Sequence, residues 1–241
     1  MAIVADEGAR GETGDPGMGA MRLMDMLSHD LTNHQQAALG FLELLDRSTN
    51  LGEGDRRLID RTVESLGQSA RLLLQVRALL AQREMASAKP AGVSLERAAE
   101  AARKAVEGVF FTHHLTIDTS DVKGAPRVRA DGLLPEVLTQ LLVLLSDSAP
   151  ADRECGLRIG ASQANGRVQL SLASDGFALD PLVTEELTST RSPPTRTRAS
   201  ASVVLVRDVL TRYGARARLE RAPKGSVGAV LIIDMAAWGS G

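Results

Sequence analysis

Residues 28–45 read SHDLTNHQQAALGFLELL, and this stretch decides the fold of the first part of the chain. No proline interrupts the sequence from Met18 to about Ser48, and its apolar residues recur at helical spacing. The apolar stripe consists of Leu27, Leu31, Ala38, Leu42 and Leu45. His34 falls on the same stripe and is therefore predicted to lie in the core. The pattern predicts one long helix.

A second long helix is predicted after the turn at residues 49–54, TNLGEG, where Gly and Asn allow the chain to reverse. It runs from Asp55, a candidate N-cap, to about Met85, and its apolar residues resemble a heptad seam. This seam consists of Ile59, Val63, Leu66, Ala70, Leu73 and Leu80. Two such helices make an antiparallel hairpin with one apolar side uncovered, so we expect a homodimeric four-helix bundle.

The rest of the chain mixes helical and strand-like patterns, which predicts an α+β protein with a C-terminal α/β sandwich. Asn165-Gly166 is a strong signal for a β-hairpin turn. The expected organisation is a flexible leader over 1–17, the dimerisation domain over 18–86, a linker over 87–93 and the second domain over 94–241. Within that domain we expect helices over 94–106, 133–148 and 201–213, strands over 114–119, around Val128 and over 156–162, 167–172, 215–220 and 229–234, and a polar loop over 178–199.

Composition excludes several classes of function. Lys plus Arg number 28 against 30 Asp plus Glu, and a net charge of −2 argues against a bulk electrostatic grip on nucleic acid. A single cysteine, Cys155, excludes an intramolecular disulfide and a thiolate metal cluster. No apolar run of about 18 residues and no basic-then-apolar start is present, so we expect a cytoplasmic protein without membrane partners.

One side chain stands out for its chemistry. At 100° per residue His29 lies opposite the apolar stripe, which predicts exposure on a rigid helix. A neutral imidazole is a competent nucleophile, and the adjacent Asp30 is placed to fix its tautomer. Asn33, four residues on, faces the same way and is suited to hold a water or a phosphoryl oxygen. An ordinary solvated histidine fits the same placement.

Residues 28–45 resemble the phosphoacceptor box of two-component sensor histidine kinases. In that family an exposed His on the first helix of a dimeric hairpin is followed directly by an acidic residue, and the fourth residue after the His is Thr or Asn. His29, Asp30 and Asn33 match this pattern. The resemblance implies that His29 carries the phosphoryl group, that Asp30 acts as base and that Asn33 supports dephosphorylation of the partner. That partner would be the receiver domain of a response regulator.

The second domain resembles the ATP-binding domain of the same family in pattern, with altered polar residues. Residues 137–150, VLTQLLVLLSDSAP, resemble its asparagine box and place Gln140, Leu144 and Asp147 at the family's polar positions. Leu144 stands where the family has a magnesium-binding Asn. A leucine supplies no oxygen ligand, so Asp147 is the candidate metal ligand.

Two further stretches resemble the glycine boxes of that domain. In residues 172–180, LASDGFALD, the adenine-reading Asp corresponds to Ser174, with Asp175 adjacent and Gly176 retained. In residues 200–214, Ser200 and Ser202 replace two glycines, and such side chains obstruct close approach of backbone to phosphate. Gly225 and Gly228 resemble a later pair of glycines in the family's ATP-binding domain. Arg191, Arg196 and Arg198 in the polar loop are suited to phosphates, or are simply solvated.

The resemblance therefore implies a histidine kinase with a divergent site for ATP and Mg²⁺, autophosphorylating on His29 and transferring the phosphoryl group to an aspartate of a response regulator. A histidine phosphotransferase with a vestigial nucleotide domain, shuttling the group between receivers, is the first alternative. A non-catalytic dimer that sequesters a regulator is the second.

Overall fold

The computed structural model describes residues 16–47, 51–107, 115–149, 154–175, 177, 180–188, 201–221 and 228–239. Within these ranges, side chains are described from residue 30 onward, except at Thr32 and Arg221. The first residues of the expected leader, and residues 189–200 of the expected polar loop with its three arginines, lie outside the described part. In that part, no helix combines the length and apolarity needed to span a membrane.

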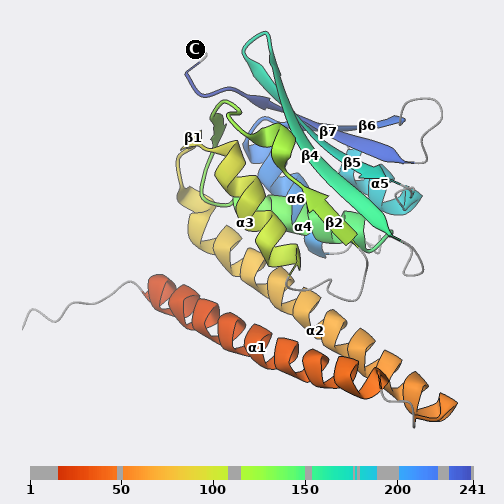
Figure 1. The fold of residues 1–241 in the computed structure, drawn as a ribbon. Helices are drawn as coiled ribbons and strands as arrows, with labels where there is room; N and C mark the ends of the chain where they lie inside the picture. The colour runs from red at the N-terminus through yellow and green to blue at the C-terminus, as the bar shows by residue number, and fades with distance from the viewer. Residues whose placement is uncertain are drawn as a thin grey trace, which may run out of the picture.

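The predicted helical hairpin is present (Figure 1). Its helices are α1 (Pro16–Asp46) and α2 (Glu53–Glu84), which lie against one another. The expected N-cap, Asp55, was wrong by three residues. Gly52 is the N-cap of α2, and Asp55 in the first turn accepts a hydrogen bond from the Gly52 amide at 3.0 Å. The Asp55 carboxylate thus stabilises the start of the helix through an otherwise unpaired N–H.

Within the hairpin, the inner face of α1 differs from the predicted stripe. Gln35 and Leu39 are buried, and the Gln35 amide donates to Ser69 Oγ on α2 at 3.0 Å. His34 is exposed, so its placement in the core was wrong for the single chain. The apolar spacing within α1 does not specify which side of the helix packs on α2. In the structure the side that carries Gln35 and Leu39, adjacent to His34, does so. On α2, by contrast, Ile59 and Ala70 of the predicted seam are buried.

The second domain follows the predicted order of helices and strands, with additions. Its elements are η1 (Met85–Ser87), β1 (Ala91–Val93), α3 (Leu95–Glu107), β2 (Leu115–Asp118), η2 (Ser120–Val122), β3 (Val128–Ala130), α4 (Leu134–Ser146), β4 (Cys155–Ala164), β5 (Arg167–Asp175), α5 (Pro181–Thr188), α6 (Ala201–Arg212), β6 (Arg216–Arg221) and β7 (Ala229–Ala236). Helix α5 lies inside the stretch that was expected to be a loop. Strand β1 lies inside the expected linker over 87–93 and pairs with β3.

A five-stranded sheet in the order β2-β4-β5-β7-β6 forms the centre of this domain. The β2–β4 pair is parallel and the other pairs are antiparallel, so β2 and β6 are the edges. Asn165 and Gly166, both with positive φ, form the predicted β4–β5 turn. Figure 1 shows α3, α4 and α6 packed on one face of the sheet, and alternate residues of β5 are buried against them: Val168, Leu170 and Leu172.

The hairpin and the second domain share one core. Ala70, Ala78 and Ala81 of α2 are buried in the same cluster as the apolar side chains of α4 and α6. Figure 1 shows α2 running along these helices on the side away from the sheet. The two predicted domains are therefore joined by packing as well as by the chain.

Candidate functional site

The predicted phosphoacceptor stretch lies within the unbroken helix α1. His29 belongs to this helix, and its side chain lies outside the described part. Asp30 and Asn33 are exposed on α1, as predicted. The backbone therefore presents Asp30 and Asn33 from a regular helix that is held against α2.

The predicted nucleotide residues of α4 face α2. Gln140 is only 1% exposed, and its Nε2 donates to the Leu74 carbonyl of α2 at 3.1 Å. Its Oε1 accepts a hydrogen bond from Ser202 Oγ of α6 at 2.7 Å. Gln75 Nε2 in turn donates to Ser202 Oγ at 3.3 Å. Gln140 and Ser202 are thus brought together, and their polar atoms bond to one another and to α2.

The ends of the same α4 stripe carry charges that also meet α2. Asp147, the predicted metal ligand, lies with Oδ1 3.7 Å from Nη1 of Arg71. At the other end, Glu136 Oε1 lies 3.3 Å from Nε of Arg77. Leu144 is buried between these ends. Gln140 and Asp147, the two residues of this stretch predicted to bind the nucleotide and its metal, therefore both contact a helix of the same chain.

Ser174, the predicted adenine partner, is buried with its hydroxyl engaged. Its Oγ donates to the Phe177 carbonyl at 2.8 Å and accepts the Ala229 N–H at 2.9 Å. Gly228 is required beside it, because a Cβ there would approach the Ser174 carbonyl oxygen to 2.2 Å. Asp175 is exposed at the end of β5. Gly176 and Ser200 lie outside the described residues.

A second buried polar cluster was missed from the sequence. Asp131 accepts hydrogen bonds from Tyr213 Oη, from Arg212 Nη2 at 2.5 Å and from the Leu133 N–H at 2.9 Å. Burial, with the hydrogen bond to Asp131, raises the pKa of the Tyr213 phenol. The only signal in the sequence was the position of Asp131, an acidic residue just before a predicted helix. That position does not reveal that Arg212 and Tyr213 are its partners.

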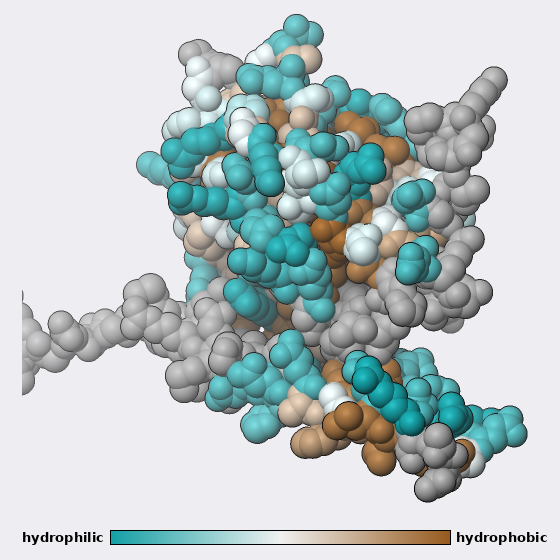
Figure 2. Space-filling model, in the orientation of Figure 1, coloured by the Kyte–Doolittle hydropathy of each residue, from teal (hydrophilic) through white to brown (hydrophobic). Residues whose placement is uncertain are grey.

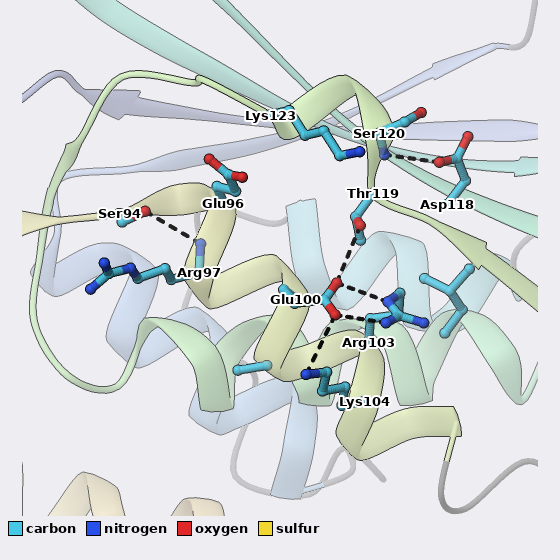
Figure 3. A pocket seen from close by; sticks show the side chains of 12 residues that line it. Ser94, Glu96, Arg97, Glu100, Arg103, Lys104, Asp118, Thr119, Ser120 and Lys123 are labelled. Atoms are coloured by element: carbon cyan, nitrogen blue, oxygen red, sulfur yellow. Dashed lines mark hydrogen bonds and ion pairs between the residues drawn. The ribbon is translucent and has the colours of Figure 1, made fainter.

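An open pocket of about 960 Å³ lies between α3, β2 and η2, and none of the predicted site residues lines it (Figure 3). Glu100 at its centre pairs with Arg103 at 2.6 Å and with Lys104 at 3.7 Å. The hydrogen bond from Arg103 lowers the pKa of Glu100 to about 2. Because none of the residues predicted to act in phosphoryl transfer or nucleotide binding lines it, this pocket is not the candidate site.

Comparison with solved structures finds proteins of similar fold. The similar solved structures are histidine kinases. The nucleotide-free catalytic domain of histidine kinase ThkA has a TM-score of 0.48 and 14% identity, covering 62% of this chain and 96% of its own. Full-length ShkA in complex with AMPPNP has a TM-score of 0.45 and 18% identity, covering 90% of this chain and 46% of its own.

The histidine kinase domain of the blue-light activated kinase EL346 from Erythrobacter litoralis has a TM-score of 0.42 and 15% identity, covering 86% of this chain and 95% of its own. No family model and no curated protein matches the sequence.

Four of the residues predicted to hold ATP and Mg²⁺, namely Gln140, Asp147, Ser174 and Ser202, are engaged inside the protein in this arrangement and do not fit that ligand. Both ends of the Gln140 amide and both hydrogen-bonding roles of the Ser174 hydroxyl are satisfied inside the protein. Leu144 offers no ligand oxygen to a hard cation. Among the described residues, no group of three or more His, Cys, Asp or Glu side chains is placed to hold a metal ion. Among the described residues, Gln140, Asp147, Ser174 and Ser202 therefore give no support to the expected kinase step from ATP.

Proposed function

We propose that the chain is a histidine phosphotransfer protein of two-component signalling, which carries a phosphoryl group on His29 and exchanges it with an aspartate of a receiver domain. The observation that carries the proposal is the match of His29, Asp30 and Asn33 to the phosphoacceptor box, on a helix where Asp30 and Asn33 are exposed. A rigid helical surface suits this chemistry, because the nucleophile must meet a partner's phosphoryl group in line.

The proposed transfer is a simple exchange of bonds. An imidazole nitrogen of His29 attacks the phosphorus of an aspartyl phosphate, an N–P bond forms, the acyl O–P bond breaks, and the receiver carboxylate leaves. Transfer to a second receiver reverses these events. Asp30 is assigned to orient the imidazole and accept its proton, and Asn33 to hold a phosphoryl oxygen or the water that hydrolyses a receiver phosphate.

A receiver is favoured over ATP as the source of the phosphoryl group. Gln140, Ser174 and Ser202 are buried and hydrogen-bonded within the protein, and Asp147 is paired with Arg71. Of the sequence-based alternatives, the phosphotransferase with a vestigial nucleotide domain is the one this arrangement supports. Autophosphorylation from ATP becomes an outcome that the experiment must distinguish.

We also propose that the hairpin forms a homodimer. On α1 a seam repeats in steps of three and four through Leu31, His34, Ala38, Phe41 and Leu45. Ala38 is half-buried and the other four are exposed, Phe41 to 67% and Leu45 to 51%. On α2, Leu58, Leu72 and Leu79 are exposed at multiples of seven residues. Figure 2 shows hydrophobic residues gathered near the turn of the hairpin. Such heptad seams pack against a second pair of helices in a four-helix bundle.

The test uses the full chain and phosphoramidate, a small donor that phosphorylates histidine directly. We expect an acid-labile phosphoryl group on His29, absent from His29→Gln and retained in the matched control His34→Gln on the same helix. The labelled protein should then lose the group to purified receiver domains, and receivers charged with labelled acetyl phosphate should label the protein.

Three results would redirect the assignment. Labelling of His29 by Mg-ATP alone would make the chain a kinase and overturn the receiver as source. Full labelling of His29→Gln would remove His29 from the mechanism. A receiver that binds wild type and His29→Gln equally, with no label on either, would favour the non-catalytic regulator-binding dimer.

A further inference from the structure

We infer that the α/β domain of this chain is a helix-binding domain whose resident ligand is α2, so that α2 and the domain move as one rigid unit. The inference rests on two attachments along α2 and does not depend on whether His29 carries phosphate. It assigns a role to residues that the family resemblance would give to a nucleotide.

The first attachment is a closed polar circuit in the middle of α2. Gln75 donates to Ser202, Ser202 donates to Gln140, and Gln140 donates to the carbonyl of Leu74, one residue before Gln75. A carbonyl oxygen has two lone pairs, so Leu74 O accepts this bond in addition to its helical one. Because every member is satisfied and Gln140 and Ser202 are buried, the circuit specifies one rotation and one register of α2.

Ion pairs flank this circuit on both sides. Arg71 meets Asp147 and Arg77 meets Glu136, so ascending positions on α4 meet descending positions on α2. Both pairs are partly exposed and contribute little stability by themselves. Their value lies in direction, because sliding or reversing α2 along α4 would separate opposite charges.

The second attachment holds the C-terminal end of α2. Arg212 of α6 donates through Nη1 to the carbonyl of Met85, the C-cap residue of α2, at 3.2 Å. The same guanidinium pairs with Asp131, which Tyr213 also contacts. Asp131 is buried, so separating it from Arg212 would leave a carboxylate without its counter-charge.

The two attachments are separated by about 15 Å along the helix, from the rise of 1.5 Å per residue between Gln75 and Met85. One contact would allow α2 to pivot, whereas two contacts at this spacing fix both its position and its rotation. The segment after α2 is fixed as well, since β1 pairs with β3. The connection between α2 and the domain is therefore held on both sides, which prevents rotation of the hairpin relative to the domain at this point.

The decisive experiment measures a distance rather than an activity. Two exposed positions, Glu64 on α2 and Gln163 near the β4–β5 turn, are changed to cysteine for spin labels in full-length chain carrying Cys155→Ala, since Cys155 is a free but buried thiol. Labelled chain is diluted with unlabelled chain, so that distances between copies do not contribute. We expect one narrow distance distribution that millimolar Mg-ATP does not change.

A broad or two-peaked distribution, or a shift on adding Mg-ATP, would overturn the inference. The attachments are then tested with Gln75→Ala plus Arg212→Ala, which should broaden the distribution, against Gln68→Ala plus Thr211→Ala at exposed neighbouring positions, which should not. If the first pair fails to fold, the distribution of the labelled parent still decides. Failure of phosphoryl transfer would leave this distance unchanged, so the two proposals fail separately.

Discussion

Replacing Gln140 by alanine offers the most direct measure of how strongly α2 is held. The substitution removes the hydrogen bond to the Leu74 carbonyl, 3.1 Å long, and the one from Ser202 Oγ, 2.7 Å long. Each neutral hydrogen bond contributes about 0.5–1.5 kcal/mol, and the space left by the amide adds roughly 1 kcal/mol. We expect the free energy of unfolding to fall by about 2–4 kcal/mol, and Tm by about 5–15 °C.

The measurement is urea and thermal unfolding of Gln140→Ala, Ser202→Ala and the double variant. Both single substitutions break the same hydrogen bond, so together they should cost less than the two costs added, by about 0.5–1.5 kcal/mol. Gln163→Ala, at an exposed position, serves as the control and should stay within about 0.5 kcal/mol of the parent. Additive costs, or a Gln140→Ala loss no larger than that of the control, would refute the circuit.

Three other predictions follow from the same structure. Phe41→Asp, on the exposed seam of α1, should convert the proposed dimer to folded monomers in sedimentation, because a carboxylate cannot be buried there without a partner; a dimer at unchanged affinity would place the interface elsewhere. Asn33→Ala should leave phosphorylation of His29 intact while slowing hydrolysis of the receiver phosphate, and an unchanged hydrolysis rate in a stopped time course would remove Asn33 from that step. An NMR titration should give Glu100 a pKa of about 2, so its ion pair with Arg103 is complete above the ordinary Glu pKa and is lost as the pH falls from there through about 2. Arg103→Gln should raise this pKa toward 4.5, and a midpoint that stays near 2 in the variant would contradict the assigned cause.

The long elements were predictable because their signals are local. The hairpin helices follow from apolar spacing over residues 18–85, and the β4–β5 turn follows from Asn165-Gly166, whose positive φ values suit that pair. Short elements were missed for the opposite reason. Strand β1 is three residues long and exists only through its pairing with β3, and α5 has eight residues with a single buried side chain, Leu187.

The sequence proposes candidate site residues but does not specify their contacts. Leu66 and Leu73 were expected to require a dimer partner, yet both are half-buried within the single chain. The sequence singles out Gln140 and Ser202 as replacements at the family's polar positions, and the structure joins them by a hydrogen bond. Their shared partner on α2 is distant in sequence from both, and nothing in the spacing of residues within one helix specifies which other helix will cover it.

The edge strand β6 has a consequence for how copies of this chain meet. Its outer side presents unpaired backbone N–H and C=O groups, which in a flat apolar strand would template a further strand. Arg216, Arg218 and Glu220 occupy this edge, and Arg218 is already paired with Glu220 and Asp234. Strand-to-strand addition there would crowd guanidinium groups and break those pairs. Growth of the sheet at β6 is thus disfavoured, whereas the proposed two-fold contact of the hairpin would close on itself and stop assembly at the dimer.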